Sequence, residues 1–162
     1  TALKPVPEEI LNTKYDLILF HYQVWYLSPS IPINSFLKSD DAKKILNNTP
    51  VITISGSRNM WIMAQEKIKV LLKEANANLV GNVALVDRVG NLISVITIVE
   101  WMFSGVKKKY LGIFPLPGVS EKDIQESSQF GEIMLDSLQK NSFSIRIGFS
   151  YRSFSHSNFC FL

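Results

Sequence analysis

Reactive and metal-binding side chains are scarce in this chain. Its 162 residues include one cysteine, Cys160, and two histidines, His21 and His156. A single cysteine excludes an internal disulfide framework and any CxxC metal or redox pair, and it indicates a reducing, cytoplasmic setting. His21 ends an apolar strand pattern, so we interpret it as a core histidine rather than a catalytic one. Because the sequence has no HExxH motif and no cluster of cysteines and histidines, it predicts no metal site.

The common phosphate-binding and hydrolase motifs are also missing. Neither GxGxxG nor GxxxxGK(S/T) occurs, so the two commonest loops that hold a nucleotide phosphate are excluded. A Ser-His-acid hydrolase would carry Gly-x-Ser-x-Gly at a strand-to-helix turn, whereas this chain reads Ile-Ser-Gly-Ser-Arg-Asn at that place. No residue is therefore assigned a catalytic role.

Charge and apolar runs limit the expected partners. Lys and Arg number 17 against 14 Asp and Glu, and the one basic cluster, Lys107 to Lys109, is interpreted as a solvated turn. We therefore expect no nucleic-acid partner. The longest apolar stretch, Leu92 to Phe103, is shorter than the roughly 18 residues that span a bilayer, so no membrane span is expected. That stretch could cover a site, pack in the core or in a homodimer contact, or, with the lysines that follow, lie on a membrane surface.

Hydrophobic periodicity predicts an α/β fold. With 46% hydrophobic and 19% charged residues, the chain fits one globular domain. Near-continuous apolar runs predict parallel strands covered on both faces. Spacings of three and four predict helices, among them a short one capped by Ser39 or Asp40. The strands are Tyr15 to Tyr22, Val51 to Ser55 and Asn78 to Val86; the helices are Asn59 to Ala75, short helices within Ile31 to Asn48, and a final helix that ends near Lys140. Strands and helices in alternation predict a parallel sheet with right-handed crossovers, and three strands suggest the later part of a doubly wound sheet.

The two ends of the chain differ from this pattern. The first dozen residues read as an irregular approach, and a start at Thr1 rather than Met suggests a processed chain or a piece of a longer protein. After residue 140 the composition changes to Ser and Phe. We therefore divide the chain into a domain at 1–140 and an atypical tail at 141–162. The tail is either poorly packed or an edge hairpin with a strand at Ser142 to Ser150.

Two loops that carry tryptophan follow the first two predicted strands. In open α/β folds, ligands bind at the carboxyl edge of the parallel sheet, where both loops would lie. Aromatic side chains that face one crevice indicate a flat, conjugated ligand, and a glycine with helix-capping residues would add hydrogen-bonding groups. The candidate binding residues are Gln23, Trp25 and Tyr26 in the first loop, and Ser55, Gly56, Ser57, Arg58, Asn59 and Trp61 in the second.

Three segments resemble a known family. They are Tyr-Asp-Leu-Ile-Leu-Phe-His-Tyr-Gln-Val-Trp-Tyr-Leu-Ser-Pro-Ser-Ile-Pro from Tyr15, Arg-Asn-Met-Trp-Ile-Met-Ala-Gln-Glu-Lys from Arg58, and Leu-Val-Gly-Asn-Val-Ala-Leu-Val-Asp-Arg from Leu79. Over roughly Asn12 to Lys140, the chain resembles the flavodoxin-like bacterial proteins named dialkylresorcinol condensing enzymes. The resemblance implies a three-layer sandwich and the cofactor flavin mononucleotide (FMN). It places Gln23 to Ser28 and Ser55 to Trp61 beside the flavin ring, with Trp25, Tyr26 and Trp61 around it.

The resemblance is to the later half of that fold. Ahead of Tyr15 there is no Ser/Thr/Gly-rich turn of the kind that holds the flavin phosphate, so the first strands of the sheet are expected to be absent. The implied function is an FMN-dependent oxidoreductase that acts on a small aromatic or cyclic diketone substrate in dialkylresorcinol biosynthesis, at a redox or aromatisation step. The alternative is a non-catalytic interaction module, or a truncated fragment that has lost cofactor binding.

Overall fold

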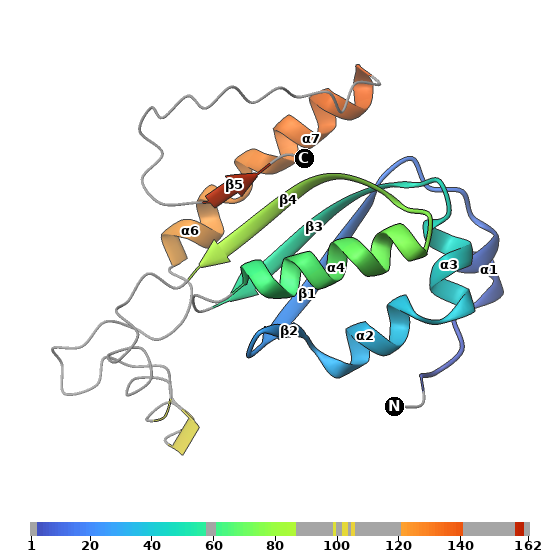
Figure 1. Ribbon diagram of the computed structural model, residues 1–162. Helices are drawn as coiled ribbons and strands as arrows, with labels where there is room; N and C mark the ends of the chain where they lie inside the picture. Colours follow the sequence, from blue (N-terminus) through green and yellow to red (C-terminus); the bar gives the residue numbers. More distant parts are fainter. Residues whose placement is uncertain are drawn as a thin grey trace, which may run out of the picture.

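A five-stranded sheet in the order β2-β1-β3-β4-β5 lies at the centre of the fold (Figure 1). The computed structural model describes residues 3–57, 61–86, 99, 102, 103, 105, 121–140 and 158–160. Strands β1 (Ile18–Trp25), β3 (Pro50–Ser57) and β4 (Asn78–Val86) are parallel. The short strands β2 (Ser28–Pro29) and β5 (Asn158–Cys160) lie antiparallel at the two ends of this order. The predicted α/β class with a parallel sheet is confirmed.

Helices cover the sheet from both sides and make three layers. On one side Phe20, Tyr22 and Val51 pack with Ile68 and Leu72, so α4 lies against the strands there. On the other side Ile52, Val80 and Val83 pack with Met134 of α7. The helices are α1 (Glu8–Asn12), α2 (Ile31–Leu37), α3 (Asp40–Leu46), α4 (Ile62–Glu74), α6 (Glu121–Glu126) and α7 (Gln129–Gln139). This arrangement is compatible with a flavodoxin-like sandwich.

Local sequence signals explain how several helices begin. The Ser39 hydroxyl accepts a hydrogen bond of 3.2 Å from the backbone N–H of Ala42 and caps α3, as the sequence predicts. Pro32 lies in the first turn of α2, where its missing N–H costs nothing. The predicted final helix is interrupted at Ser127 and Ser128, so it forms α6 and α7. Within the first dozen residues, which were predicted to be irregular, Glu8–Asn12 form α1.

The prediction that the first strand is covered on both faces is wrong. Phe20 and Tyr22 are buried beneath the α4 side, but Leu19, His21 and Gln23 on the opposite face are exposed. Leu19 keeps 52% of its surface accessible, and His21 is therefore not a core histidine. Helix α7 packs over β3 and β4, and its core cluster does not extend to this face of β1. The strand also begins and ends later in the chain than predicted, since it extends over Ile18–Trp25.

Some predictions concern residues outside the described part of the chain. From the tail, Asn158–Cys160 form β5, which pairs with Asn82 to Ala84 of β4, while the strand expected at Ser142 to Ser150 lies outside the described residues. Within Leu92 to Phe103 only Val99, Met102 and Phe103 are described, all in helical conformation. Lys107 to Lys109 lie outside as well. Where the structure describes the chain, it contains no helix of the length and apolar character that a bilayer crossing needs.

Candidate functional site

The loops after β1 and β3 start side by side at the carboxyl edge of the sheet. In the parallel ladder Tyr22 lies opposite Ser55, and Gln23 lies opposite Gly56. The two chain segments that hold most of the candidate residues therefore leave from neighbouring strands, as the sequence predicts. Arg58 and Asn59 lie outside the described residues. Helix α4 begins at the same edge with Trp61 as its N-cap, and Trp61 is half-buried.

The segment after β1 is a tight hairpin that presents aromatic side chains to solvent. Trp25 pairs with Ser28, so only Tyr26 and Leu27 form the turn. Tyr26 has a φ of 55°, in the left-handed region that bulky residues rarely adopt. Its side chain is 96% exposed and that of Trp25 is 49% exposed. A strained backbone that holds an exposed ring is a feature typical of binding sites.

Hydrogen bonds hold this hairpin against α2 and α4. Lys67 Nζ on α4 donates to Ser28 Oγ at 2.5 Å, and Asn34 Nδ2 on α2 donates to the Pro29 carbonyl at 3.3 Å. The backbone N–H of Ser30 donates to the Gln23 carbonyl at 3.0 Å. The hairpin is therefore anchored from both directions, which fixes where Trp25 and Tyr26 lie.

The two tryptophans do not share one face of the sheet. Successive side chains of a strand alternate in direction, so Trp25 projects with Gln23 and His21 on the face away from α4. Trp61 begins α4 on the opposite face. Gly56, which lies opposite Gln23 near the end of β3, is exposed and has open space where a side chain would be. A flat ligand that touches both indoles would therefore lie across the strand ends.

A buried hydrogen-bonded network lies beneath this edge and connects all three parallel strands to α4. Tyr22 Oη donates to Gln65 Oε1 at 2.7 Å, and Gln65 Nε2 donates to Thr53 Oγ1 at 3.0 Å. Thr53 Oγ1 in turn donates to Asn82 Oδ1 at 2.9 Å. All four residues are buried. A shift of α4 along the sheet would break these buried hydrogen bonds, so the network fixes the position of the helix.

Two serine hydroxyls of β3 have no hydrogen-bond partner among the described residues. Ser55 Oγ and Ser57 Oγ are both inaccessible, and neither has a partner within the described part of the chain. The Ser55 hydroxyl lies close enough to Tyr22 to lower the pKa of that phenol slightly, but it does not reach hydrogen-bond geometry. Ser55, one of the candidate binding residues, is fully buried, so its side chain is not exposed at the edge.

Tyr22 is an uncharged phenol at neutral pH. Burial raises the pKa of Tyr22 to about 12, and the nearby Ser55 hydroxyl opposes this change. A phenol with so high a pKa cannot serve as a general base near pH 7. We therefore assign Tyr22 to the structural network rather than to chemistry. Within the residues that the structure describes, no group of three or more His, Cys, Asp and Glu side chains could hold a metal ion.

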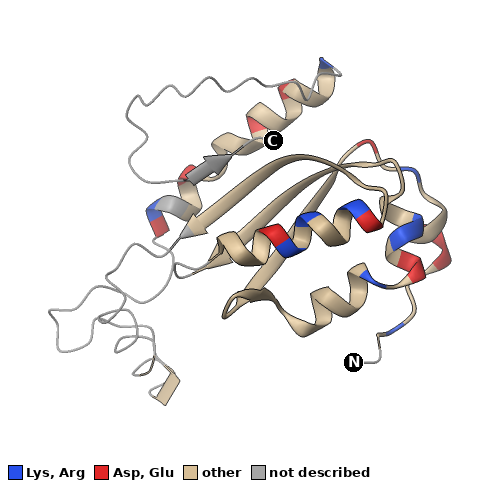
Figure 2. Cartoon of the chain, in the orientation of Figure 1, with Lys and Arg blue, Asp and Glu red and all other residues tan. Residues whose placement is uncertain are grey.

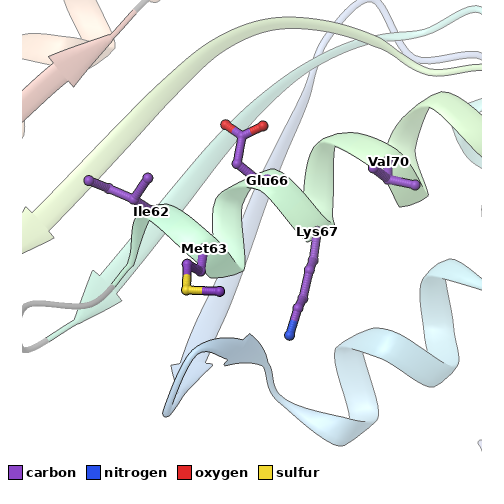
Figure 3. A pocket seen from close by; sticks show the side chains of 5 residues that line it. All are labelled: Ile62, Met63, Glu66, Lys67 and Val70. Atoms are coloured by element: carbon purple, nitrogen blue, oxygen red, sulfur yellow. The ribbon is translucent and has the colours of Figure 1, made fainter.

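A shallow apolar groove runs along the outer side of α4, next to the hairpin (Figure 3). It has a volume of about 390 Å³ and is lined by Ile62, Met63, Glu66, Lys67 and Val70. The sequence prediction missed this groove. A signal for it was present, since the apolar Met63 and Val70 lie at helical spacing from the charged Glu66 and Lys67, on the same side of the helix. Figure 2 shows charges of both signs along α4, where Lys69 Nζ lies 2.9 Å from Glu66 Oε1.

The arrangement offers aromatic surfaces and an open glycine at the end of a parallel sheet, on a rigid base. Among the described residues, it contains no cluster of acid–base groups. We compared the chain with known proteins at three levels. No family model, no curated protein and no solved structure matches it.

Proposed function

We propose that this chain binds the flat ring of a flavin at the carboxyl edge of its sheet, as an FMN-dependent oxidoreductase-like protein. One observation carries the proposal. Tyr26 holds a left-handed backbone conformation and a 96% exposed ring, beside the half-exposed Trp25, and Gly56 on the neighbouring strand is open. A flat ligand that covered these side chains would gain stacking contacts at little entropic cost.

The described residues fit the ring better than the rest of the cofactor. Trp25, Tyr26 and Trp61 would contact the isoalloxazine, and backbone groups near Gly56 would hydrogen-bond its edge. Among the described residues, none is placed to hold the phosphate of FMN. Bound flavin would supply two-electron redox chemistry, and the protein would orient the ring against a small aromatic or cyclic diketone substrate.

A titration with riboflavin tests the ring site alone, because riboflavin has the ring without the phosphate. We expect saturable quenching of flavin fluorescence by the wild-type chain. Either Tyr26→Asn or Trp25→Leu should weaken binding roughly threefold to tenfold, the equivalent of one lost ring contact. Tyr15→Leu removes a partly exposed aromatic ring that precedes β1, at the end of the strand opposite the hairpin, and serves as the matched control. Equal binding by all four chains, or no quenching by any, would reject the ring site.

The second candidate is a non-catalytic interaction module whose partner is a second copy of the chain. The uncovered face of β1 favours it, because Leu19, His21 and Gln23 are exposed in the middle of a sheet strand. The oligomeric state in solution tests this candidate without any ligand. Dimers that form without flavin would support it, and a chain that stays monomeric would reject it.

A further inference from the structure

The side-chain amide of Gln23 is available at the carboxyl edge of the sheet. Gln23 is exposed near the end of β1. Its backbone carbonyl accepts the Ser30 N–H at 3.0 Å, so the main chain at this position is tied to the hairpin. Its side chain has no hydrogen-bond partner within the part of the chain that the structure describes. An amide on a fixed backbone can therefore donate and accept hydrogen bonds with a ligand.

Gly56 leaves open space directly beside this amide. In the parallel ladder Gly56 lies opposite Gln23, and neighbouring strands are about 4.8 Å apart. Ile52 and Ile54 of β3 pack on the face away from α4, so a side chain at position 56 would project to that face, as Gln23 does. No atom lies within 4 Å of the place where its Cβ would be. The glycine therefore leaves a gap in the sheet surface next to Gln23.

Trp25 adds an aromatic surface on the same face. It lies two residues beyond Gln23 in β1, so the two side chains project in the same direction, about 6.6 Å apart along the strand. The core cluster beneath α7 does not extend to this face of β1, and both residues are exposed. An indole, an amide and a gap are therefore neighbours on one face.

The chemistry of these groups fits one kind of ring edge. The amide of a glutamine places a carbonyl acceptor beside an NH₂ donor, so it can form two hydrogen bonds with a cyclic imide, which has a ring N–H between two carbonyls. The pyrimidine end of the flavin ring is such an imide. Strand β1 contains no Lys, Arg, Asp or Glu, which suits an uncharged edge rather than an anion.

We propose that Gln23 recognises the imide edge of the bound ring, and that the gap at Gly56 admits this edge between the two strands. Trp25 supports the ring beside it. The proposal rests on the flavin-binding function and names the residue that sets its specificity for the ring. The site then selects rings with a free imide N–H over rings without one.

Titrations of the full chain with riboflavin and with riboflavin methylated at the imide nitrogen test the role of Gln23. The methyl group removes the imide N–H and leaves the rest of the ring in place. We expect the wild-type chain to bind riboflavin about tenfold more tightly than the methylated form, the equivalent of one lost hydrogen bond. Gln23→Leu should bind the two flavins equally, because it has no amide. Gln139→Leu removes an exposed glutamine at the end of α7, so it is the matched control and should keep the wild-type preference.

Gly56→Leu tests the gap. Because the space at this position is open, the variant should fold with wild-type stability in urea unfolding. Its riboflavin affinity should fall at least about tenfold, since the new side chain occupies the place of the imide edge. Gly131 on α7 also has open space where a side chain would be, so Gly131→Leu is the matched control and should bind riboflavin as wild type does.

The outcomes separate this proposal from the ring site. If the wild-type chain binds neither flavin, the ring site is wrong and this proposal fails with it. If riboflavin binds but Gly56→Leu binds it equally well, or the preference for riboflavin is absent in wild type or persists in Gln23→Leu, the ring site stands. The proposed role of Gln23 and Gly56 is then overturned.

Discussion

At the scale of single residues, the polar network around Tyr22 connects the sequence to the rigidity of the site. Tyr22, Gln65, Thr53 and Asn82 come from four different elements, and each is buried with a hydrogen bond. A buried polar group without a partner costs about 1–3 kcal/mol. The network therefore penalises any shift of α4 along the sheet, and it keeps the start of α4 at the carboxyl edge.

Tyr22→Phe tests this network through its pH dependence. At pH 7 the variant should lose about 1–2 kcal/mol of unfolding free energy, because Gln65 Oε1 loses its donor. The folded-state pKa of Tyr22 is raised to about 12, so above pH 10 the unfolded chain releases the proton first and wild-type stability falls. The advantage of wild type over the variant should shrink by about 1 kcal/mol by pH 11. Urea unfolding at pH 7, 9 and 11 measures it, and a constant difference would contradict the burial of Tyr22.

Tyr22 stabilises the folded chain, whereas the backbone conformation of Tyr26 lowers its stability. A left-handed conformation costs an ordinary residue about 1–2 kcal/mol, and asparagine pays less of this cost. Tyr26→Asn should therefore raise the free energy of unfolding by up to about 1 kcal/mol while it weakens riboflavin binding. Tyr26→Phe keeps the ring and the strain, and it should match wild type in urea unfolding. A less stable Tyr26→Asn chain would mean that the exposed ring has a structural role.

At the scale of elements, the positions of strands with continuous apolar runs could be predicted from the sequence. Which faces of those strands are buried could not. The predicted range Asn78 to Val86 coincides with β4, and Ser39 caps α3 as its position before an amphipathic turn indicates. The exposed face of β1 was missed because Leu19 and Ile18 are both large aliphatic residues. Their types do not show which of the two faces solvent. The network was missed because it joins residues far apart in the chain. Its signal was the pair of polar residues Thr53 and Asn82 inside apolar strands.

The cap of α3 gives a test at this scale. Ser39→Ala should cost about 1 kcal/mol of unfolding free energy, because the Ala42 N–H loses its acceptor. Ser30 is the N-cap of α2 but makes no side-chain cap hydrogen bond, so Ser30→Ala is the matched control and should cost less. Thermal unfolding of the two variants compares them directly. A larger loss from Ser30→Ala would show that hairpin packing matters more here than capping.

At the scale of the whole molecule, the two proposed surfaces both lie on β1. The ring site uses its carboxyl end, where the hairpin presents Trp25 and Tyr26. The self-association candidate uses the exposed face of the same strand, where Leu19, His21 and Gln23 reach solvent. Because Trp25 lies on that face as well, a dimer formed there would compete with the ring site. We therefore expect riboflavin affinity to fall as the protein concentration rises through the dimerisation range.

The most direct test of the ring site follows the indole N–H resonances of the tryptophans by NMR during a riboflavin titration. A flavin ring that lies across the strand ends should shift the signals of Trp25 and Trp61 together, with one dissociation constant, because one bound ring would contact both indoles. Assignment by Trp25→Leu and Trp61→Leu identifies the two signals. If neither signal moves at saturating riboflavin, or if only Trp101 responds, the carboxyl edge does not bind the ring and the proposed function is wrong.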